Sequence, residues 1–226
     1  MKLIIFNGSP RGKKSNTEIL TGHFIRGFTA PGENQENKVN IAYLVHVNKI
    51  AEHVNRFAEA QRVILAFPLY TDAMPGIVKY FLDRLEPLCG KKKDFEMGFI
   101  VQSGFPEAHH SRFLEKYLER LTARLGGRYL GTVVKGGVEG IQIKPPYLTK
   151  KLFRAFYRLG YHFGQTGTFH PGVVQALAKP EHLPGFTRFL YKLLAVTGIM
   201  HFYWNSQLKE NHAYDQRFNK PYPGVY

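Results

Sequence analysis

Short apolar runs that end in glycine, proline or polar residues recur along the first 135 residues of the chain. Runs of this length suit strands buried in a parallel sheet better than helices. Apolar side chains at helical spacing follow several of them. We predict five strands, at residues 2–6, 38–45, 62–67, 95–101 and 129–135, with helices between them. This alternation predicts an α/β fold with a doubly wound parallel sheet.

The loop after the first run is suited to holding an anion. Its sequence is Asn-Gly-Ser-Pro-Arg-Gly-Lys-Lys-Ser-Asn-Thr. Ser15 is a good N-cap and Glu18 follows three residues later, as in a capping box, so a helix is predicted to begin at Asn16. The first N–H groups of a helix have no intrahelical acceptor, and its dipole is positive at this end. The side chains that can add donors are those of Ser9, Ser15, Asn16 and Thr17. We therefore interpret the loop as a cradle for a phosphate monoester.

Two better-known phosphate loops do not fit this segment. A Walker motif has the form G-x-x-x-x-G-K-[ST], whereas only Ser-Pro-Arg separates Gly8 from Gly12, and Lys13 is followed by Lys14. The dinucleotide fingerprint G-x-G-x-x-G fails at the same spacing. An ordinary turn between a strand and a helix stays open as the alternative.

Two later loops have equally unusual sequences. Residues 68–76, Pro-Leu-Tyr-Thr-Asp-Ala-Met-Pro-Gly, follow the third run, and residues 102–107, Gln-Ser-Gly-Phe-Pro-Glu, follow the fourth. In an open parallel sheet, ligands bind outside the carboxyl ends of the strands, where the strand order reverses. All three loops are predicted to meet there.

Taken together, these motifs resemble those of the flavodoxin-like NAD(P)H-dependent FMN reductases, including their quinone-reductase and iron-sulfur-flavoprotein branches. The resemblance covers about residues 1–140. The matching motifs are Asn7-Gly-Ser-Pro-Arg11, Ser15-Asn-Thr17, Pro68-Leu-Tyr70, Met74-Pro-Gly76 with Lys79, Asp83-Arg84, and Ser103-Gly104. The resemblance implies a flavodoxin-like sheet of order 2-1-3-4-5. It also implies that the first loop holds the FMN phosphate, the second lies along the isoalloxazine ring, and the third borders its pyrimidine edge.

The residues expected to bind FMN are Ser9, Arg11, Ser15, Asn16, Thr17, Pro68, Leu69, Tyr70, Ser103 and Gly104. Tyr70 or Leu69 can lie flat on a tricyclic ring, and Gly104 lets backbone N–H groups approach ring carbonyls. We assign no catalytic residue, because the nicotinamide and the flavin carry the hydride chemistry. Tyr70, His109 and His110 are candidate proton donors, and for the two histidines the alternative is an exposed position at a helix start.

Cysteine usage separates this chain from the iron-sulfur branch. That branch has clustered cysteines between its second and third strands, whereas residues 46–60 contain none here. Cys89 is the only cysteine in the sequence, so we expect no intrachain disulfide and no cysteine-rich metal site. The histidines are scattered, and we expect no metal. Met1 to Phe6 is too short for a signal peptide, so the sequence predicts a cytoplasmic protein.

Positive charge is concentrated in the later part of the chain. The formal net charge is +14, of which residues 91–226 contribute +11. One explanation is recruitment of NAD(P)H phosphates or anionic acceptors, and another is attraction to an anionic membrane or nucleic acid. No nucleic-acid motif accompanies the charge, so we expect no nucleic-acid partner.

The last 80 residues lie largely beyond the resemblance. We assign residues 1–168 to the FMN-binding domain and residues 169–226 to a C-terminal helical extension and arm. Residues 147–163 predict a basic amphipathic helix that closes the fold. Residues 186–204 are strongly apolar but are interrupted by basic side chains, so a membrane-spanning helix is not expected. Two interpretations remain, a helix packed on its own domain or in a homodimer interface, and an interfacial helix that brings the enzyme to membrane quinones.

The predicted function is an FMN-dependent NAD(P)H oxidoreductase. It would pass hydride from a nicotinamide to FMN and on to a small acceptor such as a quinone, a nitro or azo compound, or a flavin. By resemblance we expect a homodimer. The alternative is a flavin-binding electron carrier or redox sensor that does not turn over NAD(P)H.

Overall fold

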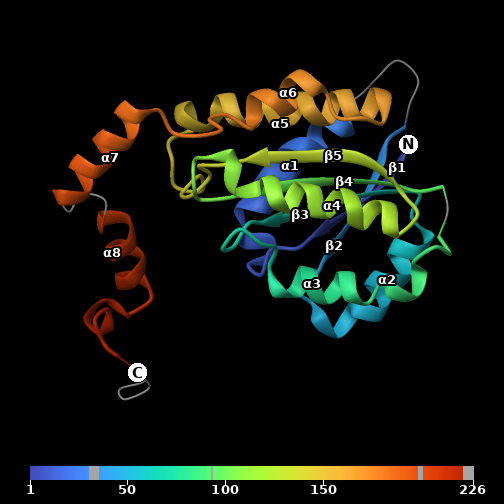
Figure 1. Cartoon of the computed structure of the whole chain (residues 1–226), viewed down its shortest axis with the longest axis horizontal. Helices are drawn as coiled ribbons and strands as arrows, with labels where there is room; N and C mark the ends of the chain where they lie inside the picture. Colours follow the sequence, from blue (N-terminus) through green and yellow to red (C-terminus); the bar gives the residue numbers. More distant parts are fainter. Residues whose placement is uncertain (31–35, 93, 198–200, 221–226) are drawn as a thin grey trace. The chain divides into compact units, whose positions relative to one another are not determined.

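A five-stranded parallel sheet organises the chain, as predicted (Figure 1). The computed structural model describes residues 1–30, 36–92, 94–197 and 201–220. The strands are β1 (Lys2–Asn7), β2 (Lys38–Tyr43), β3 (Arg62–Pro68), β4 (Glu96–Gln102) and β5 (Arg128–Lys135). Their order is β2-β1-β3-β4-β5, and every adjacent pair is parallel. The strand order therefore reverses between β1 and β3, where the first and second loops leave the sheet.

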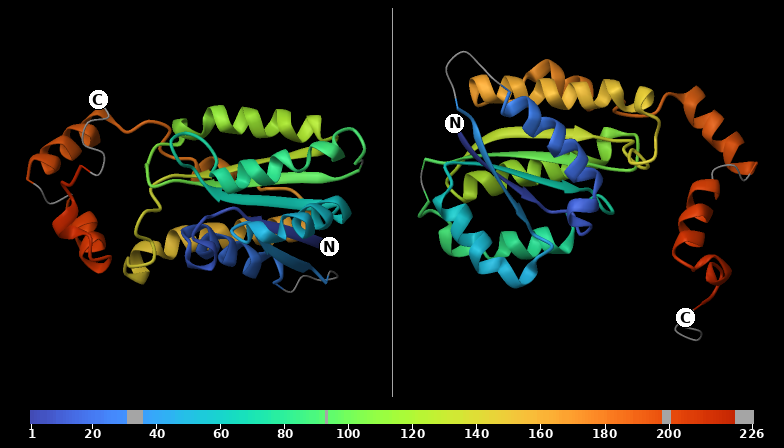
Figure 2. Two further views of the ribbon diagram at one scale, coloured as in Figure 1. Left: turned by 90° about the horizontal axis from the view of Figure 1, so that it is seen from below. Right: turned by 180° about the vertical axis from the view of Figure 1, so that it is seen from behind.

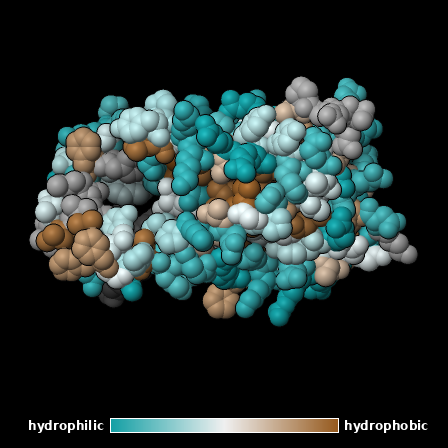
Figure 3. Space-filling model, turned by 90° about the horizontal axis from the view of Figure 1, so that it is seen from above, coloured by the Kyte–Doolittle hydropathy of each residue, from teal (hydrophilic) through white to brown (hydrophobic). Residues whose placement is uncertain are grey.

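Helices cover both faces of the sheet (Figure 2). On one face lie α1 (Asn16–Phe28), α5 (Pro146–Thr166) and α6 (Pro171–Leu177), and on the other α2 (Ile50–Glu59), α3 (Gly76–Asp83) and α4 (Arg112–Arg124). Short 3-10 turns are at Gly12–Lys14, Val47–Lys49, Glu86–Leu88, Ala108–Ser111 and Tyr214–Gln216. Figure 3 shows the face that α5 and α6 cover, where an apolar area lies among hydrophilic side chains.

Alternating strand residues build two separate cores. Phe6 and Leu65 belong to the cluster that packs against α2, α3 and α4, whereas Ile5 and Ile64 belong to the cluster beneath α1, α5 and α6. Successive side chains of a strand point to opposite faces, so a strand covered on both faces must be apolar throughout. This is why the strands appear in the sequence as continuous apolar runs.

Helices α1 and α5 approach each other closely through glycines. A Cβ atom on Gly27 would lie 1.9 Å from the carbonyl oxygen of Tyr157, and one on Gly160 would lie 1.9 Å from that of Phe24. Each helix thus presents a glycine to the backbone of the other. No other residue fits at either position without moving the helices apart.

Residues that follow α6 return to the loop after β4. The backbone N–H of Ala108 donates to the Pro180 carbonyl at 2.9 Å, and Arg112 Nε donates to Glu181 Oε1 at 2.9 Å. The compact unit of the sheet accordingly extends from Met1 to His182. It includes residues 169–182, which the sequence-based division assigned to the extension. The functional division into two parts stays a prediction.

The second compact unit spans Leu183–Tyr226 and contains α7 (Gly185–Val196) and α8 (His201–Glu210). The single helix predicted over residues 186–204 was wrong, because α7 ends at Val196 and α8 begins at His201. Thr197, directly after α7, has low helix propensity, and apolar patterning alone did not take this into account. No helix within the described ranges is long and apolar enough to cross a bilayer.

Candidate functional site

The amino end of α1 presents a row of backbone donors. Ser15 caps the helix, since its Oγ accepts from the N–H of Glu18 at 3.1 Å and donates to the Gly12 carbonyl at 2.6 Å. The helix begins at Asn16, as predicted. In the described part of the chain, no protein acceptor faces the N–H groups of Ser15, Asn16 and Thr17. Three consecutive donors at the positive end of a helix dipole favour an anion.

Two buried hydroxyls can add to this row. Ser9 Oγ accepts from the N–H of Arg11 at 3.3 Å, and Thr17 Oγ1 accepts from Gln102 Nε2 at 3.3 Å. Each hydroxyl therefore still has its own hydrogen to donate. Ser15 differs, because its hydroxyl already donates and accepts within the loop, so its backbone N–H is the group it offers.

Asn7 and Glu18 hold the loop from beneath. Asn7 Oδ1 accepts from the N–H of Ser9 at 3.0 Å, and Asn7 Nδ2 donates to Glu18 Oε2 at 2.8 Å. The hydroxyl of Tyr43 donates to Glu18 Oε1 at 2.9 Å. Burial, together with this hydrogen bond to a carboxylate, raises the pKa of Tyr43 to about 12. Glu18 thus ties β1 and β2 to the helix start instead of completing the predicted capping box.

Hydrogen bonds join the three predicted loops at the carboxyl edge of the sheet. The side-chain amide of Gln102 donates to Thr17 at the end of the first loop. The backbone carbonyl of Gln102 accepts from the N–H of Leu69 in the second loop at 2.7 Å. A fourth loop, after β5, also takes part: Asn16 Nδ2 donates to the Val138 carbonyl at 3.0 Å. The N–H of Val138 in turn donates to the Ser103 carbonyl at 3.0 Å. The predicted meeting of the three loops is confirmed, and the fourth was missed.

The second loop contains a tight turn with an unusual backbone. Tyr70 and Ala73 exchange two backbone hydrogen bonds, of 2.8 and 3.0 Å, around Thr71 and Asp72. Both central residues have positive φ, 49° at Thr71 and 58° at Asp72, as in a type I′ turn. A β-branched residue in this region is strained, a feature that clusters at functional sites. Asp72 Oδ1 also lies 3.0 Å from His110 Nδ1, which links the second loop to the third.

The expected FMN-binding residues divide into a buried floor and an exposed rim. The buried ones are Ser9, Ser15, Asn16, Thr17, Pro68, Leu69 and Ser103. Arg11, Tyr70 and Gly104 are exposed, and Tyr70 has 47% of its surface accessible. A ligand can reach the rim directly, whereas the floor can contact only a group that enters between the loops. A hollow of about 930 Å³ lies elsewhere, between α1 and α5.

The two histidines among the candidate proton donors lie in the 3-10 turn that follows the third loop. His110 contacts Asp72, and His109 Nδ1 lies 3.2 Å from the Glu181 carbonyl. One ligand atom each of Glu107, His109 and His182 lies within 4.8 Å of the others. No sequence pattern marks this group, because His182 is far along the chain from the other two.

Residues 1–152 match the model of a protein family, Flavodoxin_2, described as having a flavodoxin-like fold. The chain belongs to this family. The sheet order and the loops at the reversal of strand order are those of its fold, so the family resemblance noted in the sequence is confirmed at this level. A comparison of this flavodoxin-like protein with curated proteins finds no match.

Solved structures share the fold at low sequence identity. A putative quinone reductase from Klebsiella pneumoniae aligns with a TM-score of 0.57 at 15% identity, over 82% of this chain and 96% of that chain. An NAD(P)H:quinone oxidoreductase from Methanothermobacter marburgensis gives 0.56 at 14% identity, over 72% and 96%. An FMN-dependent NADH-azoreductase from Bacillus anthracis, in complex with FMN, gives 0.55 at 15% identity, over 73% and 98%. For the flavodoxin-like protein, these likenesses establish the fold.

Proposed function

We propose that this flavodoxin-like protein binds FMN and acts as an NAD(P)H-dependent oxidoreductase that reduces a small acceptor. The observation that carries the proposal is the row of N–H donors at residues 15–17, flanked by two buried hydroxyls, at the reversal of strand order. These groups match a phosphate monoester in number and type, since each of its oxygens accepts hydrogen bonds. Structural neighbours named as FMN-dependent or quinone reductases support the same assignment.

The second and third loops have the chemistry expected beside the ring. Tyr70 supplies an exposed aromatic surface, and the Asp72–His110 contact fixes the turn that carries it. At the opposite edge, Gly104 is exposed and has no side chain to block a carbonyl from backbone donors. Bound FMN would supply the redox chemistry, accepting hydride from a nicotinamide and passing electrons to the acceptor. The chain's own part is to orient the ring and to restrict water around it.

We propose no single class of electron acceptor and no single proton donor. Quinones, nitro compounds, azo compounds and flavins all accept electrons from the same reduced ring. The hydroxyl of Tyr70 belongs to the second loop, and the imidazoles of His109 and His110 belong to the 3-10 turn that follows the third loop. We assign none of them as a catalytic residue.

Spectra of the purified protein test the proposal. Bound FMN gives a yellow protein, and anaerobic mixing with NADPH or NADH is expected to bleach its flavin band rapidly. A yellow protein that neither nucleotide bleaches would support the alternative, an electron carrier or redox sensor. A colourless protein that fails to bind FMN at micromolar concentration would refute both.

Substitution of Thr17 tests the cradle itself. Thr17→Val keeps the side-chain shape but removes the hydroxyl, so FMN affinity is expected to fall about fivefold to tenfold. Thr122→Val is the matched control, because Thr122 is equally buried and its hydroxyl donates to the Leu118 carbonyl within α4, at 2.8 Å. The control should lower stability without changing the FMN dissociation constant. Equal FMN affinity in all three proteins would place the phosphate elsewhere.

The assembly and the location of the protein are also proposals. A homodimer is proposed because related reductases build their active sites near a subunit interface, and a cytoplasmic location because cysteine is scarce. Analytical ultracentrifugation with and without FMN tests the first.

A further inference from the structure

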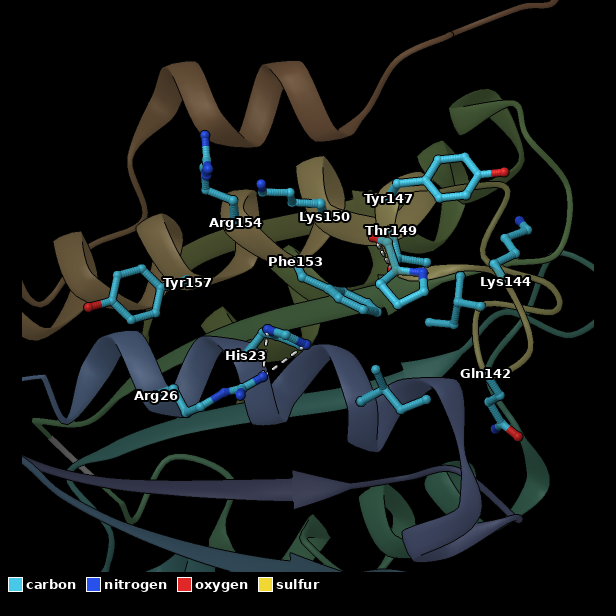
Figure 4. Close-up of a pocket in the computed structure, with 13 residues that line it drawn as sticks. His23, Arg26, Gln142, Lys144, Tyr147, Thr149, Lys150, Phe153, Arg154 and Tyr157 are labelled. Carbon is cyan, nitrogen blue, oxygen red and sulfur yellow. Dashed lines mark hydrogen bonds between the residues drawn. The ribbon is translucent and has the colours of Figure 1, made fainter.

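A groove of about 930 Å³ runs between α1 and α5, outside the proposed flavin site (Figure 4). Its volume is in the range of small-molecule sites. His23 from α1 and Phe153 from α5 form its middle, with their rings stacked 4.0 Å apart and 16° from parallel. Tyr147 and Tyr157 lie toward the ends of the lining part of α5. Aromatic side chains thus line the groove along its length.

The charged residues that line this groove are all cationic. They are Arg26, Lys144, Lys150 and Arg154. Among the described residues that line the groove there is no aspartate or glutamate, so no carboxylate within the lining neutralises the four cations. Four like charges around one hollow repel one another and are stabilised when an anion enters.

His23 adds an uncharged ring to this surface. Burial, reinforced by the nearby Arg26 guanidinium, lowers the pKa of His23 to about 4. The imidazole is therefore neutral at pH 7, and an Arg26 nitrogen lies 2.7 Å from its Nδ1. The middle of the groove is an uncharged aromatic surface and its borders are cationic.

We propose that this groove binds a planar aromatic molecule that carries at least two negative charges. The ring would pack against Phe153 and His23, and the anionic groups would pair with Lys150 and Arg154 on one side and with Arg26 or Lys144 on the other. Nucleoside phosphates and sulfonated or carboxylated aromatics share this chemistry. The proposal does not depend on FMN binding.

Two other occupants fit the groove less well. A second copy docked by the same face would bring two sets of four cations together, which is unfavourable for a twofold contact. An anionic membrane matches the charge, but a flat lipid surface would contact the exposed Tyr147 and Tyr157 more readily than the half-buried pair His23 and Phe153. Charge and concavity together favour a small molecule.

Calorimetric titration of the full chain with four probes tests the proposal. ADP and anthraquinone-2,6-disulfonate each combine a ring with two or more charges, whereas adenosine has only the ring and pyrophosphate only the charge. We expect the first two to bind at least about tenfold more tightly than the last two. Binding of ADP alone identifies a nucleotide site, and binding of both shows that any anionic ring suffices. Pyrophosphate as tight as ADP would overturn the proposal.

Charge reversal locates the binding. Lys150→Glu combined with Arg154→Glu is expected to weaken the binding of both aromatic anions at least about tenfold. The matched control is Lys116→Glu with Arg120→Glu, which makes the same change at the same spacing on α4, on the other face of the sheet. The dissociation constants of the control variant should stay within about twofold of those of the original protein. Circular dichroism should show that all variants are folded.

Equal weakening by both pairs of substitutions would show a general charge effect and overturn the proposal. So would failure of every probe to bind, accompanied by sedimentation with phosphatidylserine vesicles that only the α5 substitutions abolish. That result would make the face a membrane contact.

Phe153→Leu retains a side chain of similar volume but removes the ring. It is expected to weaken the binding of ADP and to leave the binding of pyrophosphate unchanged.

Discussion

His23 lies against Phe153 and beside Arg26, and both its burial and the neighbouring cation favour the neutral imidazole. Its pKa is about 4 in the folded protein and near 6.5 when unfolded. Between these values the unfolded chain binds more protons, so the stabilising effect is complete above about pH 6.5 and is lost as the pH falls toward 4. The melting temperature is expected to fall over this range less steeply in His23→Phe than in the original protein. Identical pH profiles would show that the pKa of His23 is the same in the folded and unfolded chain. His53, whose pKa burial also lowers, contributes equally to both proteins.

Individual residues were predictable from sequence where their partners are near in the chain. Ser15 was identified as the cap because the acceptor and the helix start lie within three residues of each other. The Asp72–His110 contact spans 38 positions and was not found, because no local pattern encodes it. Glu18 was expected to bond locally and instead bonds Asn7 and Tyr43, since the sheet brings β1 and β2 to the helix start.

The close contact between α1 and α5 predicts how glycine substitutions in these helices change stability. Gly160→Ala would place a methyl group 1.9 Å from the Phe24 carbonyl, so the helices must separate, and unfolding free energy is expected to fall by about 3 kcal/mol. Gly22→Ala is the matched control, because Gly22 lies in α1 with nothing within 4 Å of an added Cβ. That change should stabilise the protein by about 0.5–1 kcal/mol through helix propensity. Urea unfolding measures both, and equal effects would contradict close packing at Gly160.

Elements were predicted well where burial on two faces leaves a continuous apolar run. All five strands were located, within two residues at their ends. The apolar run and the turn after it were sufficient to predict β1. Helix α5 was recognised by its amphipathic spacing, although its use of Gly160 to approach α1 was not, because a glycine in a helical pattern gives no sign of its partner. The break between α7 and α8 was missed because apolar patterning continues through it.

At the scale of the whole molecule, the two compact units differ in their contribution to stability. No member of either hydrophobic core lies beyond Leu177 among the described residues. A chain ending at His182 is therefore expected to fold with an unfolding free energy within about 1 kcal/mol of the full chain, as measured by urea denaturation. Loss of cooperative unfolding in the shortened chain would show that residues 183–226 complete the fold. The alternation of strand and helix predicted a doubly wound parallel sheet, whereas the strand order was implied by the family resemblance.

The loop at residues 7–15 is already hydrogen-bonded along its length, from the Gly8 N–H to the Ala66 carbonyl through to the Lys14 N–H and the Arg11 carbonyl. It leaves β1, an inner strand that pairs with β2 on one side and β3 on the other. A loop that is already ordered loses little chain entropy when the proposed anion binds. Little of the interaction free energy is therefore offset by ordering the site. Substitutions that reshape this loop would also disturb a buried inner strand, so tolerance to sequence change should be low there.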